Sequence, residues 1–459
     1  MNPRSKFVSV CAAAAALFCI PLSLSAQKND QATAKLGSPG FTRMAPVPME
    51  SVHSVTSSPV LTFPAGATTS RGQFATDANG ISLGKPEREN AAASANSAVI
   101  GNGTLFGLDT VPTFEGAFAA TGGPSEGRVF PYVMIGNDPK VGGTTTLPAK
   151  ITTVSLRLLN ADGSVNQVIS YDPFENLTLD SPVFADALYG DGRSQFTDAV
   201  QRAEFFNTMK QNWHTSLNPT VVNRVTITVP RFVNVTLPNG STVPVQNYFV
   251  GTAPNGDPFV ELLDLFFNSV FDNQVVSDIN AGNNTTDAFN MQLYPNTFLF
   301  SIDNTGKFAS CCVLGFHTFF QDTSVSPQPR FISAFASWIS PGLFGTGIED
   351  VTGLSHEVTE AYNDPFTNTV VPRWQFPGQP ANSTVCQGNL ETGDPVEVLP
   401  DATVSIPTRE GGGKIFTFHP QTEALLQWFS QGPASNAIDG AWSYPNENAL
   451  TRSAVPCPQ

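Results

Sequence analysis

Short apolar runs separated by turn-forming residues are the feature that most limits how this chain can fold. Residues 129–135, 151–159 and 165–171 are such runs, and Asn-Ala-Asp-Gly at 160–163 separates the last two. Apolar runs of this length, bounded by Asn, Gly and Pro, predict strands joined by hairpins. We therefore expect an α+β protein whose N-terminal half is β-rich and sandwich-like.

Three segments break this pattern and predict helices. Residues 195–213 and 348–362 carry apolar side chains at helical spacing. The apolar run 259–271 is a further helix candidate. With these helices we divide the mature chain into a β-rich region, 101–300, and a region with a candidate metal site, 301–459.

The first 100 residues predict export followed by a flexible lead. Arg4 and Lys6 precede residues 7–24, which carry no charge, and small residues lead up to Ala26. This order is typical of a signal peptide cleaved after residue 26. The alternative is an uncleaved anchor, since eighteen apolar residues just reach spanning length. Residues 27–100 are rich in Ala, Ser, Thr, Pro and Gly, which predicts a flexible lead. Its removal as a pro-segment stays open.

Charge limits the partners of the chain. Lys and Arg number 23 against 38 Asp and Glu, so the net charge is −15. Phosphate binding needs a basic face, so this balance argues against nucleic acid and against an anionic membrane surface. We expect a protein secreted to the periplasm or the extracellular space, with no membrane contact after signal cleavage.

Four cysteines remain after the signal peptide: Cys311, Cys312, Cys386 and Cys457. In an oxidising compartment an even number predicts two disulfides, with three possible pairings. Adjacent side chains of an extended strand point to opposite faces. We therefore expect Cys311 and Cys312 to pair with distant partners. Free buried thiols are the alternative.

The residues that indicate chemistry are His356, Glu357 and Glu360, within Ser-His-Glu-Val-Thr-Glu. On a helix, positions i and i+4 share a face, so His356 and Glu360 could bind one divalent ion. Glu357 holds the position of the general base in metalloproteases with an H-E-x-x-H helix. The alternative is a solvated helix face with no ligand.

Catalytic zinc needs a third protein ligand. Acidic residues follow in Cys-Gln-Gly-Asn-Leu-Glu-Thr-Gly-Asp-Pro-Val-Glu, where Glu391 is the first choice and Asp394 the second. Gly393 would let the backbone turn between them. His317, in a Phe-rich strand, could face the site, although a hydrogen-bonded core histidine is the more common role. Two carboxylates in the site also allow a harder ion such as calcium.

The helix motif, with Asn363-Asp364-Pro365 after it, resembles the H-E-[LV]-x-E-A-x-[TN]-[DN]-P stretch of secreted EXORDIUM-like (phosphate-induced) proteins and their bacterial relatives. Glu391-Thr392-Gly393-Asp394 and Gly315-Phe316-His317 are similar to further elements of that group. The resemblance covers about residues 310–395 and implies a zincin-like metal helix. Here Cys386 precedes the acidic segment, whereas in that group the cysteine follows it.

Three functions fit these observations. The first is a secreted zinc-dependent hydrolase of the peptidase kind, acting on a peptide or protein, in which Glu357 activates water. The second is a non-catalytic extracellular or cell-envelope protein with at most a structural metal. The third is a carbohydrate-binding module that uses the tryptophans.

Overall fold

The computed structural model describes residues 60–61 and 110–457, apart from 237–239, 303–305, 307, 322–328, 345–346, 380–385, 398, 410–412 and 433–436. The predicted signal peptide, and all of the predicted lead except residues 60–61, lie outside the described residues. The fold is β-rich with a few helices, which confirms the α+β prediction at that level.

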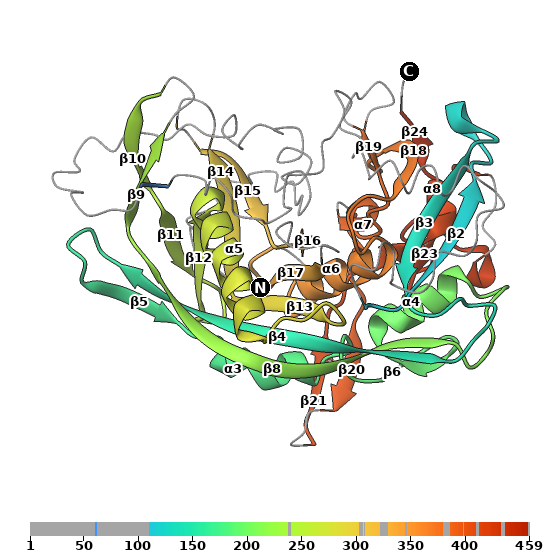
Figure 1. Ribbon diagram of the computed structural model, residues 1–459, viewed down its shortest axis with the longest axis horizontal. Helices are drawn as coiled ribbons and strands as arrows, with labels where there is room; N and C mark the ends of the chain where they lie inside the picture. Colours follow the sequence, from blue (N-terminus) through green and yellow to red (C-terminus); the bar gives the residue numbers. More distant parts are fainter. Residues whose placement is uncertain are drawn as a thin grey trace, which may run out of the picture.

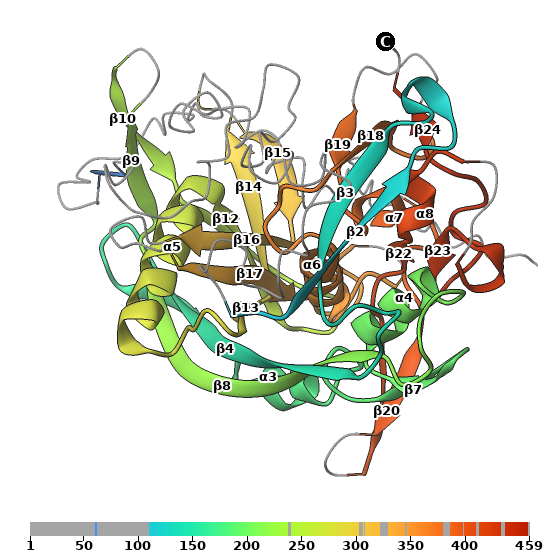
Figure 2. The ribbon, with the colours of Figure 1, turned by 45° about the vertical axis from the view of Figure 1, so that its right-hand side comes forward.

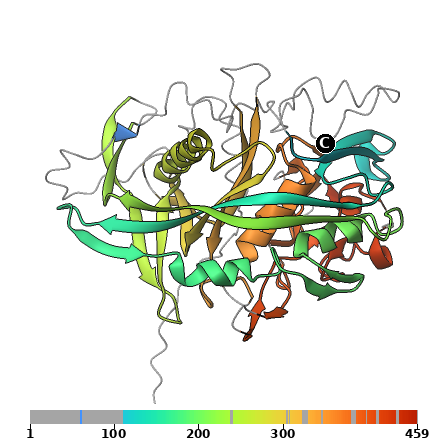
Figure 3. The ribbon, with the colours of Figure 1, turned by 60° about the horizontal axis from the view of Figure 1, so that its bottom comes forward.

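A six-stranded mixed sheet forms the centre of the molecule. It consists of β16 (Gly315–Gln321), β17 (Arg330–Trp338), β13 (Phe289–Pro295), β4 (Thr144–Leu159), β5 (Val165–Ile169) and β8 (His214–Val229). β17, β13, β4 and β8 pair in parallel, and β16 is antiparallel to β17 at one edge. β4 and β8 lie side by side across the molecule (Figures 1 and 3). Residues 101–300 and 301–459 therefore contribute strands to one sheet.

Different helices cover the two faces of this sheet. On one face, Phe271 of α5 (Asp264–Ala281) packs edge-to-face on Phe316 of β16, with ring centroids 5.0 Å apart. Side chains alternate between faces along a strand, so the next residue, His317, points to the opposite face. There α6 (Thr352–Asn363) packs against β16 and β17 (Figure 2). The strand period thus places a histidine against the motif helix.

Smaller sheets surround this centre. The four-stranded sheet contains β11 (Tyr248–Thr252), β12 (Pro258–Leu263), β14 (Thr297–Ile302) and β15 (Phe308–Val313). The three-stranded sheets are β1 (Val60–Leu61), β9 (Phe232–Thr236) and β10 (Thr242–Gln246), and β19 (Gln387–Asn389), β18 (Val370–Gln375) and β24 (Val455–Pro456). The two-stranded pairs are β2 (Thr113–Ala119) with β3 (Val129–Ile135), β6 (Ala187–Tyr189) with β7 (Gly192–Ser194), β20 (Ile406–Arg409) with β21 (Ile415–Phe418), and β22 (Glu423–Ala424) with β23 (Ser443–Tyr444).

The remaining helices are shorter than α5 and α6. They are α3 (Asp172–Leu179), α4 (Phe196–Glu204), α7 (Asp394–Glu397) and α8 (Leu426–Phe429), with 3-10 turns at Gly123–Ser125 and Ile438–Gly440. No helix within the described ranges is both long and apolar enough to cross a membrane.

The helix predictions are right in part. The prediction at 348–362 is confirmed, although α6 begins at Thr352. The prediction at 195–213 is right only as far as Glu204, where α4 ends. The prediction at 259–271 is wrong in its first part, because Pro258–Leu263 pairs with β14 as strand β12. A continuous apolar run fits a buried strand as well as a buried helix, so periodicity alone could not separate the two.

The described structure contains two disulfides, Cys311–Cys312 and Cys386–Cys457. The expectation that Cys311 and Cys312 pair with distant partners is wrong. It assumed regular alternation, but the pairing of β14 with β15 shifts register beside these residues, opposite Phe300. A bulge of this kind changes the direction of side chains.

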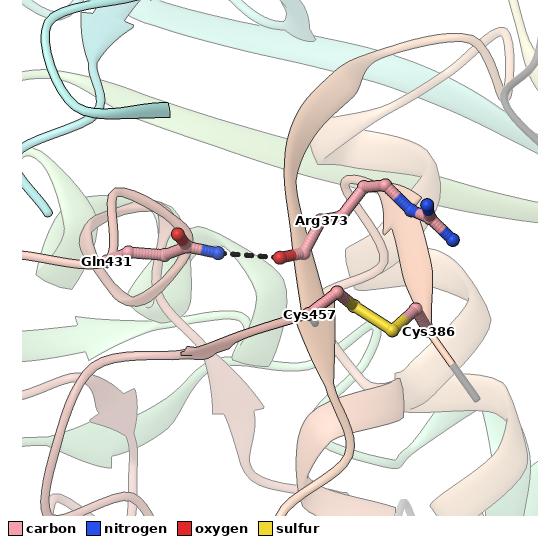
Figure 4. The surroundings of a disulfide bond; sticks show 4 residues. All are labelled: Arg373, Cys386, Gln431 and Cys457. Carbon is pink, nitrogen blue, oxygen red and sulfur yellow. Dashed lines mark hydrogen bonds between the residues drawn. A yellow bond between two sulfur atoms is a disulfide. The ribbon is translucent and has the colours of Figure 1, made fainter. Parts of the chain in front are cut away.

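The second disulfide ties the C-terminal end of the chain to the segment before β19 (Figure 4). Gln431 Nε2 donates a hydrogen bond to the carbonyl oxygen of Arg373, on β18, at 2.7 Å. The backbone N–H of Cys457 donates to the same oxygen at 3.2 Å. The disulfide therefore holds the strand that leads into the acidic segment at residues 391–394.

Candidate metal centre

The motif helix places His356 and Glu360 together, as the sequence predicts. His356 Nε2 lies 3.2 Å from Glu360 Oε1, one helical turn away. Every residue of α6 is buried, and the side chain of Glu360 is fully inaccessible. This burial excludes the alternative of a solvated helix face. A buried carboxylate needs a proton, a cation or several hydrogen bonds to offset its lost hydration.

Asp394, the first residue of α7, completes a group of three. Its Oδ1 lies 3.8 Å from His356 Nε2, and the facing atoms of His356, Glu360 and Asp394 all lie within 4.8 Å of one another. One imidazole and two carboxylates are a ligand set that zinc accepts. These buried groups could bind a metal ion.

His317 forms a second group with the same helix. Its Nδ1 lies 3.4 Å from Glu360 Oε2 and 3.5 Å from Glu357 Oε2. Within the described chain, neither ring nitrogen of His317 makes a hydrogen bond. His317 therefore faces the site, and the more common role of a hydrogen-bonded core histidine does not describe it.

Most of these atoms are spaced more widely than hydrogen-bonded atoms. Donor–acceptor distances between nitrogen and oxygen fall at about 2.7–3.2 Å. The His356–Glu360 pair stands at the upper end of that range, at 3.2 Å, and the other pairs lie 3.4–3.8 Å apart. Two ligands bound to tetrahedral zinc at about 2.0–2.1 Å lie roughly 3.4 Å from each other. The side chains are thus arranged with the spacing of atoms that share an ion.

Glu391, the first choice for a third ligand, lies near Nε2 of His317, whereas Glu357 and Glu360 lie near its Nδ1. Its Oε2 is 4.0 Å from His317 Nε2, and it belongs to neither group of three. Its role as a ligand stays a prediction, and Asp394 lies closer to the pair on α6.

Gln421 orients the ring of His356. Its Nε2 donates to the carbonyl oxygen of Gly393 at 2.7 Å, so its Oε1 faces His356 Nδ1 at 3.1 Å and accepts a hydrogen bond from the Nδ1–H. The backbone N–H of Gln421 donates to Ser355 Oγ at 2.8 Å, which fixes the residue to α6. With the proton on Nδ1, the lone pair of Nε2 points toward Glu360 and Asp394. Metal-binding histidines are oriented in the same way by partners of their other nitrogen.

Two glycines allow the backbone to approach this site closely. A Cβ on Gly393 would lie 2.5 Å from His356 Nδ1, and one on Gly315 would lie 2.7 Å from Glu357 Oε1. The backbone N–H of Gly393 also donates to Glu360 Oε1 at 3.1 Å. The sequence suggested that Gly393 permits a turn, but φ is not positive there. Its function in the fold is this close contact.

Burial and neighbouring charges shift the pKa values in the site in opposite directions. Burial raises the pKa of Glu357 to about 7. Burial also acts on Glu360, but the two histidines outweigh it and lower the pKa of Glu360 to about 2. Burial disfavours the charged form of His317, yet Glu357 and Glu360 raise its pKa well above the usual value. A divalent cation would displace such protons, because metals bind neutral imidazole and ionised carboxylate.

Sequence reasoning missed three further residues of the centre. Gln421 orients His356, as described above. Gln387 Nε2 donates to Asp394 Oδ2. Glu423 is fully buried nearby, and burial raises the pKa of its carboxyl group well above the usual value. All three come from strands or loops distant from the motif, and no spacing in the sequence indicates them.

A small cavity of about 20 Å³ reaches this centre. Gly315, His356, Glu357, Glu397 and Gln421 are among its lining residues. A cavity of this size has room for about one water molecule.

The acidic group around His419 is less suited to a metal ion than this centre, and the tryptophans are poorly placed for a sugar. His419 Nδ1 lies 2.8 Å from Asp350 Oδ2 and 3.2 Å from Glu349 Oε1, so it already has a hydrogen-bonded partner. Trp213, Trp374 and Trp428 are fully buried in the core, which is the more common fate of tryptophan and does not favour a sugar-binding groove.

No family model, curated protein or solved structure matches this chain. The resemblance to EXORDIUM-like proteins therefore stays an expectation.

Proposed function

We propose that the protein is a secreted metal-dependent hydrolase of the zinc peptidase kind, with a zincin-like C-terminal part. The observation that carries this proposal is the buried group of His356 Nε2, Glu360 Oε1 and Asp394 Oδ1 beside a cavity for one water molecule. Zinc with three protein ligands keeps a fourth position for water or substrate. Bound there, the metal would lower the pKa of water and polarise a scissile carbonyl.

The residues around the ion would have separate roles. His356, Glu360 and Asp394 would hold it, and Gln421 would keep His356 in the tautomer that binds. Glu357 is one of the residues that line the cavity, and its carboxylate would accept a proton from the water molecule that attacks the carbonyl. A peptide or protein is the substrate class that this chemistry suits.

The test compares two carboxamide variants for metal content and for hydrolysis of a peptide and ester panel. Glu357→Gln is expected to keep the ion at His356 while hydrolysis falls by roughly 10²–10⁴-fold, the usual contribution of a general base. Glu360→Gln is expected to lose both metal and hydrolysis. Full hydrolysis by Glu357→Gln would contradict the mechanism.

A non-catalytic protein with a structural metal is the second candidate, and the burial of the site favours it. The side chains of His317, His356, Glu357, Glu360, Glu391 and Asp394 are each 8% exposed or less. Structural metal sites are closed, whereas catalytic sites stay open to substrate. Bound metal without hydrolysis of any peptide or ester, together with loss of folding on chelation, would support this candidate. Bound calcium in place of zinc would point the same way.

Both candidates include secretion, which two features of the chain favour. The two disulfides suit an oxidising compartment, and the predicted signal peptide at residues 1–26 suits export. Mass spectrometry of the N-terminus of the mature protein tests this, with Gln27 as the expected first residue.

A further inference from the structure

The geometry points to a site for two adjacent divalent ions, with Glu360 as the carboxylate that bridges them. This inference rests on the proposed metal site and extends it. The first ion is held by His356, Glu360 and Asp394. The second is held by His317, Glu357 and Glu360.

The two oxygens of Glu360 face different histidines. Oε1 lies 3.2 Å from His356 Nε2, and Oε2 lies 3.4 Å from His317 Nδ1. The two groups of three that could bind an ion share only Glu360. A carboxylate that presents one oxygen to each group has the orientation of a bridge between two ions. Ions in such sites lie about 3.5–4 Å apart.

His317 provides the independent observation for the second ion. Its side chain is 1% exposed, and neither nitrogen has a hydrogen-bonded partner among the described residues. Its Nδ1 points between Glu357 Oε2 and Glu360 Oε2 at 3.5 and 3.4 Å. Leaving the nitrogens of a buried imidazole without a hydrogen bond is costly, and an ion bound to Nδ1 would satisfy that nitrogen.

Charge agrees with two ions. Glu357, Glu360, Asp394 and Glu391 all lie within 4.0 Å of a histidine in the centre. If ionised, these four carboxylates carry −4, so a single divalent cation leaves negative charge uncompensated and a second one reduces it. Buried charge that is not balanced is strongly unfavourable.

Glu391 and Glu357 have consistent places in this arrangement. Glu391 lies on the side of His317 Nε2, the nitrogen opposite the second ion, with its Oε2 at 4.0 Å. Glu357 faces His317 with Oε2 at 3.5 Å. Its Oε1 lies beside Gly315, and both residues line the cavity. Glu357 can therefore hold the second ion with one oxygen and accept a proton with the other.

The test is a manganese titration of the purified, metal-depleted mature protein, monitored by elemental analysis and electron paramagnetic resonance. The disulfides stay intact, so their sulfurs offer no thiolate ligands. We expect two equivalents of Mn(II) in the wild type and a spin-coupled spectrum, because ions this close interact magnetically. The wild-type spectrum needs no variant, so the test does not depend on a substitution being tolerated.

Two histidine variants locate the second ion. His317→Ala is expected to bind one equivalent with an uncoupled spectrum. His419→Ala, the matched control, removes a histidine from the other acidic group with Glu349 and Asp350 and is expected to keep two equivalents.

The outcomes separate this inference from the proposed function. One equivalent in the wild type would overturn the second ion and leave the site at His356 standing. Two equivalents without spin coupling, or loss of the second ion in His419→Ala, would also overturn the paired site. No bound manganese, and no bound zinc in a parallel titration, would reject both proposals.

Discussion

Replacement of Gly393 by alanine should weaken metal binding without removing any ligand. The new Cβ would lie 2.5 Å from Nδ1, 2.6 Å from Cε1 and 2.7 Å from Cγ of the His356 ring. Ordinary contact begins at 3.4 Å, so ring or backbone must move by about 0.7–0.9 Å. Metal–ligand distances tolerate only about 0.2 Å. The movement would also strain the hydrogen bond from His356 to Gln421.

We expect the dissociation constant for zinc to rise by roughly 10–100-fold, the usual effect of disturbing the partners that orient a ligand. That change corresponds to about 1.4–2.8 kcal/mol. The assay is competition with a chromophoric chelator, with circular dichroism to confirm that the variant is folded.

Gly163→Ala is the matched control. Gly163 has φ of +83°, and a Cβ added to it would have no atom within 4 Å, so its replacement strains the turn between β4 and β5, which supplies no residue to the metal centre. It should reduce stability by about 1–2 kcal/mol and leave zinc affinity unchanged. A folded Gly393→Ala variant that binds zinc as tightly as the wild type would refute the argument from close contact.

Three further perturbations test other parts of the account. Gln421→Ala should raise the dissociation constant for zinc by roughly 10–100-fold, because His356 loses the acceptor for its Nδ1 proton; unchanged chelator competition would show that Gln421 does not orient the ring. Replacing both Cys386 and Cys457 by serine removes a cross-link between residues 71 positions apart. It should lower the free energy of unfolding by about 2–4 kcal/mol, measured by urea titration. A smaller loss would show that this disulfide contributes little to stability. Burial raises the pKa of Glu204 from 4.5 to about 8, so the folded state holds a proton that the unfolded state releases. The contribution of Glu204 to stability is then largest below pH 4.5 and falls as pH rises to about 8, by up to about 5 kcal/mol. Glu204→Gln should remove this component of the pH profile, and an unaltered profile would contradict it.

Elements formed by residues close together in the sequence, such as helices and hairpins, were predictable from side-chain periodicity and turn residues. The helix at the motif and the pairing of residues 151–159 with 165–169 follow from periodicity and turn chemistry, and both are present as α6 and the β4–β5 pair. The parallel pairing of β4 with β8 and β13 joins segments far apart in the sequence. No local pattern encodes such contacts, so the shared central sheet could not be predicted.

The candidate site was predictable where one helix supplies it. His356 and Glu360 are brought together by helical geometry alone. His317 could only be named as an alternative, because its approach depends on the packing of β16 against α6. Asp394 and Gln421 enter from two further segments. The choice between Glu391 and Asp394 depended on loop conformation, which residue spacing does not determine.

Elemental analysis of the purified mature protein beside Glu360→Gln tests the central claim most directly. We predict at least one equivalent of a divalent metal in the wild type and a loss of that metal in the variant, since Glu360 faces both histidines. Metal retained in full by a folded Glu360→Gln variant, or absent from the wild type even after added zinc and calcium, would contradict it.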